Sequence, residues 1–119
     1  MKTSIVAEKS YSFAIRIVKL YKWLSGERKE YVLSKQLLRS GTAIGALLRE
    51  ATHAQSKPDF LNKVNIALKE ANEAVYWLML LKDTAYITIE EFMSINIDAE
   101  ELLRLLTSIV KTTKVRLER

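Results

Sequence analysis

A segment of small residues near the middle of the chain constrains the fold more than any other feature. Between Arg39 and Arg49 the sequence reads Ser-Gly-Thr-Ala-Ile-Gly-Ala-Leu-Leu, inside an otherwise helical pattern. Two glycines in a helix interior destabilise it by about 2 kcal/mol in total relative to alanine. Close approach of a neighbouring helix to the backbone at Gly41 and Gly45 would compensate for this loss. We therefore predict a tightly packed helix pair with these glycines at the contact.

Helix-breaking residues are scarce in the rest of the chain. Pro58 is the only proline, and Gly26 is the only other glycine among the 119 residues. Apolar residues recur at helical spacing, and no strand-like alternation of useful length is present. The pattern predicts helices over about residues 4–24, 31–55, 57–85 and 88–115. Joined by short loops, these helices would form one all-α domain over residues 1–119, an antiparallel up-down four-helix bundle.

Local signals mark where the predicted helices begin and end. Gly26 suits the position after a helix C-terminus, where a left-handed backbone conformation is needed. Ser56 and Asp59 have the spacing of a capping box, which predicts the start of the third helix. Thr88 and Glu91 have the same spacing and predict the start of the fourth.

The first and third helices carry more apolar surface than a single bundle can bury. The core stripe of the first helix consists of Phe13, Ile17, Leu20 and Leu24. A second stripe beside it consists of Tyr11, Ala14, Val18 and Tyr21. Residues 74–81 of the third helix are apolar around the whole circumference. Because large exposed apolar patches usually mark partner surfaces, we predict a homo-oligomer. The residues assigned to its interface are Tyr76, Trp77, Met79 and Leu80.

The composition favours a cytoplasmic protein. Cysteine is absent, so the chain has no disulfide framework, thiolate metal site or thiol nucleophile. The first residues lack the apolar stretch of a signal peptide. The longest apolar stretch, Ala74–Leu81, is far shorter than the roughly 20 residues that a membrane helix needs. We expect no membrane association.

Positive charge is concentrated in the first half of the chain. Residues 1–55 carry ten Lys or Arg against four acids, or +6, whereas residues 56–119 carry a net charge of −1. Such asymmetry indicates an electropositive face for a polyanion such as nucleic acid, or else a solvated surface that maintains solubility. The residues predicted to bind RNA or DNA are Lys9, Arg16, Lys19, Lys22, Arg28, Lys29, Lys35, Arg39 and Arg49.

The spacing of these cations predicts how they are arranged. Lys2, Lys9 and Arg16 recur every seven residues, which places them on one polar stripe opposite the core face of the first helix. Phosphate contacts from such a stripe would be strongly salt-dependent and nearly indifferent to base sequence. Tyr21 and Trp23 could stack on unpaired bases, or else pack in the core or between subunits.

The remaining polar residues predict neither a metal site nor catalysis. Glu50 and His53 have the Glu-x-x-His spacing of di-iron bundles, but His53 is the only histidine and a second such pair is missing. Ser40 and Ser56 lie in packing and capping positions, with no base placed beside them by the sequence. We therefore predict a non-enzymatic protein without a cofactor or metal.

Three glutamates lie close to the apolar stripes of the second and third helices. They are Glu50, Glu70 and Glu73. An unpaired carboxylate there would be destabilising, because burial removes it from water. We expect these carboxylates to pair with Arg39, Lys69 or backbone donors.

Several segments of the chain together resemble one known family. They are Gln36–Ala46, Glu50-Ala51, Ser56, Asp59-Phe60, Ala67–Ala71 and Trp77-Leu78. The most specific is Arg-Ser-Gly-Thr-x-Ile-Gly at residues 39–45. In these residues the chain is similar to the small bacterial four helix bundle protein family, also called the 23S rRNA intervening sequence protein or S23 family.

The resemblance implies an up-down four-helix bundle that assembles into a ring-like homopentamer without enzymatic activity. The chain is also similar to the accessory variability protein of diversity-generating retroelements. That resemblance implies a basic surface for nucleic acid and a reverse transcriptase as a partner. The leading hypothesis is therefore a non-catalytic oligomeric module that binds RNA or DNA. The alternative is a protein–protein scaffold, for example a reverse transcriptase accessory subunit, with no direct nucleic-acid contact.

Overall fold

Helices account for most of the chain in the computed structural model, which describes residues 2–118 and their side chains from residue 5 onward. The helices are α1 (Lys2–Gly26), α2 (Leu33–Ala51), α3 (Lys57–Asp83) and α4 (Ile89–Glu118). No strand occurs within this range. The prediction of an all-α chain with four helices is therefore confirmed for residues 2–118.

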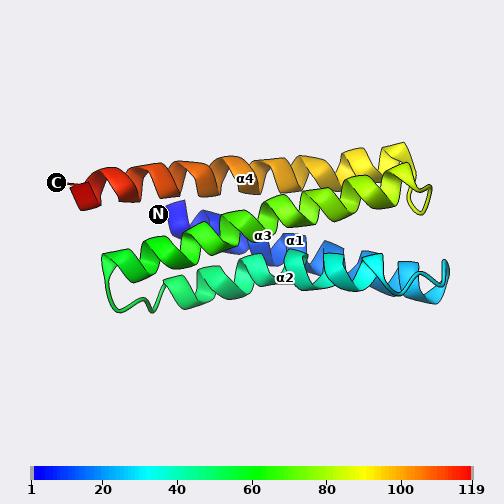
Figure 1. The fold of residues 1–119 in the computed structure, drawn as a ribbon, viewed down its shortest axis with the longest axis horizontal. Helices are drawn as coiled ribbons and strands as arrows, with labels where there is room; N and C mark the ends of the chain where they lie inside the picture. The colour runs from blue at the N-terminus through cyan, green and yellow to red at the C-terminus, as the bar shows by residue number, and fades with distance from the viewer. Residues whose placement is uncertain (1, 119) are drawn as a thin grey trace.

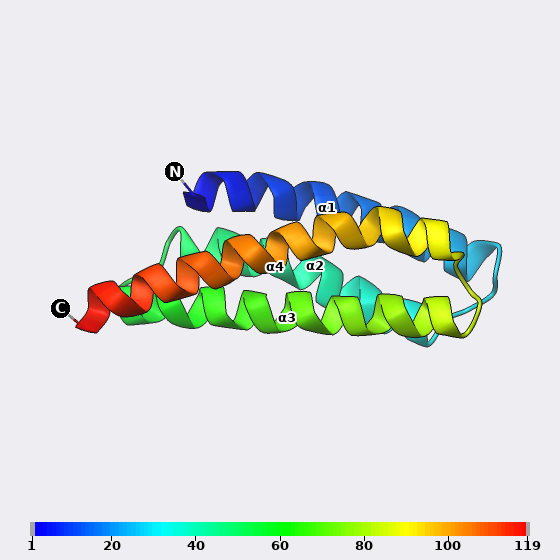
Figure 2. The same ribbon diagram turned by 90° about the horizontal axis from the view of Figure 1, so that it is seen from above.

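The four helices lie side by side in a rod of 51 × 21 × 20 Å. Successive helices run in alternate directions, so the α1–α2 and α3–α4 loops lie at one end of the rod and both chain ends at the other (Figure 1). α1 packs against α2 and α4, and α3 packs against the same two helices. α4 extends past the beginning of α1 (Figure 2). Each helix therefore keeps one flank open to solvent.

Apolar side chains at helical spacing fill the space between the helices. The largest fully buried ones are Phe13, Ile17, Leu24, Leu37, Ile44, Leu78, Leu81, Leu102 and Leu106. Each such burial stabilises the fold by about 1.5–3 kcal/mol relative to an exposed side chain. Phe13, Ile17 and Leu24 belong to the core stripe predicted for the first helix, which is confirmed at these positions. Tyr11 is an exception in the second stripe of α1, because 65% of it is exposed.

The glycines of α2 lie at its contact with α1. A Cβ atom added to Gly41 would lie 2.8 Å from Ile17 Cγ1 and 2.9 Å from Ile17 Cγ2. A Cβ atom on Gly45 would lie 3.3 Å from Ser10 Oγ. Ser10 itself is buried and donates a hydrogen bond to the carbonyl of Ala7 at 2.7 Å. The two backbones therefore approach closely where α2 has no side chains.

The α1–α2 connection differs from the prediction. Gly26 is the last residue of α1 and has no left-handed conformation, whereas Lys29 does, with φ 56°. The turn that reverses the chain is therefore placed three residues later than predicted. Glu30 follows it, and its backbone N–H donates to the carbonyl of Leu24 at 2.9 Å.

A buried glutamate caps α2. The carboxylate of Glu30 accepts hydrogen bonds from the backbone N–H groups of Val32 at 3.1 Å, Leu33 at 3.0 Å and Ser34 at 2.7 Å. Burial raises the pKa of Glu30, but the hydrogen bonds from Leu33, Ser34 and Val32 lower it more, so the pKa lies below its ordinary value. Since this cap satisfies the first free donors of the helix, α2 begins at Leu33 instead of Tyr31.

The other two helix starts match their predicted capping residues. Glu91 N donates to Thr88 Oγ1 at 3.0 Å and Thr88 N donates to Glu91 Oε1 at 2.8 Å, so this capping box is complete. Asp59 N donates to Ser56 Oγ at 3.1 Å. The Asp59 carboxylate accepts from the N–H of Gln55 at 3.3 Å and not from that of Ser56. α2 ends at Ala51, short of the predicted residue 55.

Candidate nucleic-acid interface

The nine predicted nucleic-acid-binding residues divide into those that bond to other parts of the protein and those that do not. Lys9 and Arg16 belong to the first group. On the flank of α1 that faces α4, Lys9 Nζ lies 3.1 Å from Glu101 Oε1, and Arg16 Nη1 lies 2.7 Å from Asp98 Oδ2. Arg16 also donates to Ser94 Oγ at 2.9 Å. The stripe predicted opposite the core is therefore wrong for these two residues. Lys2, its third member, has a side chain outside the described residues.

Arg39 connects α2 to α3. Its guanidinium donates to Glu70 Oε2 at 3.4 Å and to Glu73 Oε1. Trp77 Nε1 donates to the same Glu73 oxygen at 3.3 Å. The predicted pairing of Glu70 and Glu73 with Arg39 is confirmed. These contacts give Arg39 a structural role.

Glu50 has a different partner from those predicted. Its carboxylate lies 3.2 Å from Lys63 Nζ of α3, not beside Arg39 or Lys69. His53 is exposed three residues later. Within the described residues, no three of His, Asp and Glu gather into a cluster that could hold a metal ion.

Arg28 joins the two loops at one end of the rod. It donates to the carbonyl of Tyr86 at 2.9 Å and to that of Ala85 at 3.3 Å. Its guanidinium carbon lies 5.1 Å from the ring centroid of Tyr86 and 5.9 Å from that of Trp23. Trp23, a predicted stacking residue, is therefore already in contact with a cation of its own chain.

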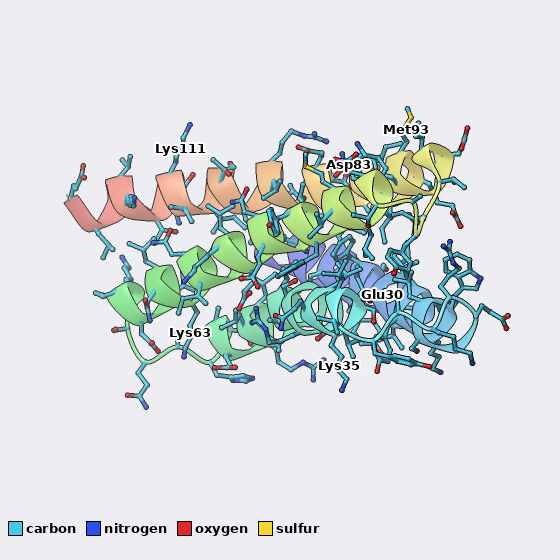
Figure 3. The ribbon with its side chains drawn as sticks, turned by 45° about the vertical axis from the view of Figure 1, so that its right-hand side comes forward. Glu30, Lys35, Lys63, Asp83, Met93 and Lys111 are labelled. Atoms are coloured by element: carbon cyan, nitrogen blue, oxygen red, sulfur yellow. The ribbon has the colours of Figure 1, made fainter. Side chains whose placement is uncertain are left out.

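Five of the nine cations are exposed and have neither an ion pair nor a side-chain hydrogen bond within residues 5–118. They are Lys19, Lys22, Lys29, Lys35 and Arg49. Lys35 and Arg49 are fourteen residues apart, which places them along one side of α2. Lys35 extends away from the bundle (Figure 3). We call these five residues the open cations.

A groove follows the outer side of the α1–α2 contact. Its partly buried floor consists of small residues: Ala7, Ala14, Thr42 and Gly45. The exposed residues that line it are Glu8, Tyr11, Ser12, Ala46, Arg49, Thr52 and His53. The floor is low because no large side chain separates the two helices there. An exposed tyrosine of α1 and an open cation of α2, Tyr11 and Arg49, therefore line the same groove.

The sequence placed Tyr11 in the excess apolar surface of the first helix and did not predict it as a nucleic-acid-binding residue. The apolar stripe that contains it lies at the edge of the buried face of α1, where the sequence does not decide between core and solvent. Its neighbour one turn later, Ile15, is also 42% exposed. Tyr21, the other predicted stacking residue of α1, is only partly exposed.

The residues predicted to form an oligomer interface have mixed exposure. Tyr76 is 57% and Met79 is 45% exposed on α3, whereas Trp77 and Leu80 are partly buried. Trp77 packs against the core, and its ring lies edge-on to that of Tyr76 with centroids 5.0 Å apart. Much of the Trp77 side chain is therefore already covered by its own bundle.

A second exposed apolar stripe lies on α4. Ile89, Met93 and Ile97 are spaced by four residues and are each 59–69% exposed. Met93 extends outward from the end of the rod that holds the α3–α4 loop (Figure 3). This stripe was not predicted. The apolar residues of α4 already define a core face, and three further apolar residues do not stand out from that pattern. We call the exposed stripe the α4 stripe.

The two candidate serines are engaged in structure. Ser40 is buried and donates to the carbonyl of Gln36 at 3.0 Å, and Ser56 caps α3. None of the helices described over residues 2–118 has an apolar stretch long enough to span a bilayer.

These features define an all-helical, four-helix protein with open cations on α1, on α2 and in the loop that joins them. Comparison with known families gives its relationship. The chain belongs to the 23S rRNA-intervening sequence protein family, whose profile matches residues 2–108. The predicted resemblance to this family is thereby confirmed.

A solved structure supports the same assignment. The chain is 61% identical to a protein with unknown function from the S23 ribosomal protein family of Bacteroides thetaiotaomicron VPI-5482, with a TM-score of 0.92. The alignment covers 93% of this chain and 99% of the other. No curated protein matches the chain.

Proposed function

We propose that this protein is a non-catalytic, homo-oligomeric module that binds RNA or DNA through the outer side of α1 and α2. The observation that carries the proposal is the set of five open cations, Lys19, Lys22, Lys29, Lys35 and Arg49. An exposed cation without an internal partner can exchange its counterions for phosphates at little structural loss. Lys9, Arg16, Arg28 and Arg39 are already bonded to carboxylates or carbonyls, so they contribute less.

The acids on this side of the protein are few. Four carboxylates belong to α1, α2 and their loop. Glu30 is buried and Glu50 is paired with Lys63, so within residues 5–118 only Glu8 and Glu27 are exposed and unpaired there. Repulsion of a polyanion is therefore weak along α2 and the loop, whereas Glu90 and Glu91 of α4 line a hollow together with Lys19. Because phosphate contacts carry no base information, binding would be broad in sequence and steep in salt.

Self-association would multiply these contacts. The proposed assembly is a ring of antiparallel bundles, a pentamer by the family resemblance, formed through exposed apolar residues of α3 and α4. Apolar side chains of this kind become buried in stable oligomers. Repetition of the cations around a ring would raise the avidity for a long polyanion without any new contact type. A cytoplasmic location is proposed from the absence of cysteine.

A titration of fluorescently labelled structured RNA and duplex DNA at 50 mM and 200 mM salt tests the proposal. We expect saturable binding to both, weakened by about 10³-fold or more at the higher salt if six or more phosphates are neutralised. Absence of binding even at the lower salt would eliminate the proposal.

The second candidate function is a protein–protein scaffold that does not touch nucleic acid. The α4 stripe favours it, because three exposed apolar residues at helical spacing suit a protein partner better than a polyanion. A reverse transcriptase is the partner proposed from the resemblance. Two results together would favour this function. The protein would bind no nucleic acid on its own, and it would still capture a purified reverse transcriptase after nuclease treatment.

A further inference from the structure

We infer that the α1–α2 groove binds an unpaired nucleobase, stacked on Tyr11, with its phosphate held by Arg49; this rests on the proposed function and specifies single-stranded nucleic acid as its ligand. Tyr11 is 65% exposed, and its hydroxyl makes no hydrogen bond within residues 5–118. A lone exposed aromatic residue is common on proteins. Tyr11 differs because it borders a groove with open cations on the same side.

The shape of the groove suits a flat ring. Its floor of Ala7, Ala14, Thr42 and Gly45 has no side chain larger than threonine. A base lying against the face of Tyr11 would therefore meet no bulky residue on the floor of the groove. Ile15 extends the exposed apolar surface by one turn of α1, which provides contact for a second base. Bases in a duplex are stacked on one another and cannot enter such a groove, so the ligand must be unpaired.

The charges of the groove give the ligand a direction. Arg49 and His53 lie on its α2 side, whereas Glu8 lies on its α1 side. A phosphate is attracted to Arg49 and repelled by Glu8, so the backbone would follow α2. The Glu8 carboxylate is then placed to accept a hydrogen bond from an N–H group at the edge of the base.

The open cations continue the path beyond the groove. Lys22 is eleven residues from Tyr11 on α1, a rise of about 16 Å along the helix axis. Lys35 lies fourteen residues from Arg49 on the antiparallel α2, so it occurs at the same end of the pair as Lys22. The path is therefore long enough for a short oligonucleotide, with a stacking site at one end and cations toward the other.

The experiment compares wild-type protein with Tyr11→Phe, Tyr11→Leu and a control, Tyr31→Leu. Tyr31 is exposed, but it lies outside the groove. Each protein is titrated with a labelled eight-nucleotide single-stranded RNA and with an eight-base-pair duplex at two salt concentrations. Circular dichroism and light scattering verify that each variant keeps the wild-type fold and mass.

We expect Tyr11→Leu to weaken single-strand binding about tenfold, as loss of one stacked base predicts. Tyr11→Phe and Tyr31→Leu should stay within about twofold of wild type. The tenfold factor should be the same at both salt concentrations, because stacking releases no counterions, and duplex binding should not change.

The possible failures are separable. Wild-type protein that binds neither ligand would overturn the proposed function and this inference together. Normal wild-type binding with an unchanged affinity of Tyr11→Leu would overturn only the inference. A change of mass in Tyr11→Leu would identify Tyr11 as a subunit contact and would also overturn it.

Discussion

Ile17 of α1 lies directly over the backbone of Gly41 in α2: a Cβ atom at position 41 would be only 2.8 Å from Ile17 Cγ1. Ile17 is fully buried, and protein interiors are packed closely enough that such a side chain moves aside only at a cost. This contact explains how α2 can remain stable with two glycines, Gly41 and Gly45, one turn apart in its interior. It also fixes the groove, because the same close approach continues along the helices to Gly45.

Substitution of Gly41 by alanine tests this contact. Although alanine favours a helix over glycine by about 1 kcal/mol, overpacking against Ile17 should outweigh this gain and destabilise the protein by about 1–3 kcal/mol. Urea denaturation measures the change. Gly26→Ala is the matched control, since nothing lies within 4 Å of the Cβ position there and no positive φ is present. A Gly41→Ala protein as stable as Gly26→Ala would contradict the contact.

Glu30 should make the stability depend on pH. Because its folded-state pKa is lowered, its contribution is complete above the pKa of the unfolded chain, about 4.3, and is lost as the pH falls through the lower folded-state value. Glu30→Gln should therefore be less stable than wild type by about 1–2 kcal/mol at pH 7. The two proteins should converge in stability at acid pH. Glu27→Gln, an exposed neighbour, serves as the control, and a Glu30→Gln deficit that did not depend on pH would refute the effect.

Arg16 should matter for stability more than for binding. Its partners Asp98 and Ser94 are on α4, so Arg16→Gln should reduce the free energy of unfolding by up to about 1 kcal/mol, the usual size for an exposed ion pair. Its affinity for RNA should stay within about threefold of wild type, because the arginine is already neutralised by Asp98. Lys22→Gln is the comparison, and we expect it to weaken RNA binding while leaving the free energy of unfolding unchanged. Equal losses of affinity in both variants would show that the internal ion pair does not decide which cations bind.

The α4 stripe should hold subunits together. Met93→Lys combined with Ile97→Lys places two charges in a surface that is already exposed in one chain, so folding of the single bundle should be retained. In an oligomer the same charges would be buried without partners, which is strongly destabilising. Light scattering should therefore show a fall in molar mass toward the 13.7 kDa of one chain. An unchanged multimeric mass would exclude the stripe from the interface.

Much of the fold could be predicted because it depends on local spacing. The core faces of the helices follow the periodicity of apolar residues, and Thr88 with Glu91 fixes the start of α4 through bonds only three residues apart. The start of α2 was predicted too early because a buried glutamate caps it from the preceding loop. Neither the buried state of Glu30 nor its hydrogen bonds to three successive backbone donors has a sequence signature.

The candidate site was less predictable, because it depends on contacts between distant residues. Nothing in the sequence around Lys9 and Arg16 distinguishes them from Lys22. Their acidic partners lie on α4, more than eighty residues away. Spacing along one helix cannot reveal such pairs. Tyr11 was assigned to the excess apolar surface of the first helix and not to a binding site, because the groove that it lines forms only where α2 lies beside α1.

One binding comparison tests the central claim most directly. The triple substitution Lys22→Ala, Lys35→Ala and Arg49→Ala is compared with Lys111→Ala, Lys114→Ala and Arg116→Ala on α4, which removes the same charge from another surface. Affinity for a labelled single-stranded RNA is measured across a salt series. We expect the affinity of the first triple variant to fall about tenfold or more at low salt, and its slope of log K against log salt to decrease by about 2. The affinity and slope of the second triple variant should stay near those of wild type. Equal losses from both variants would contradict a binding face on α1 and α2.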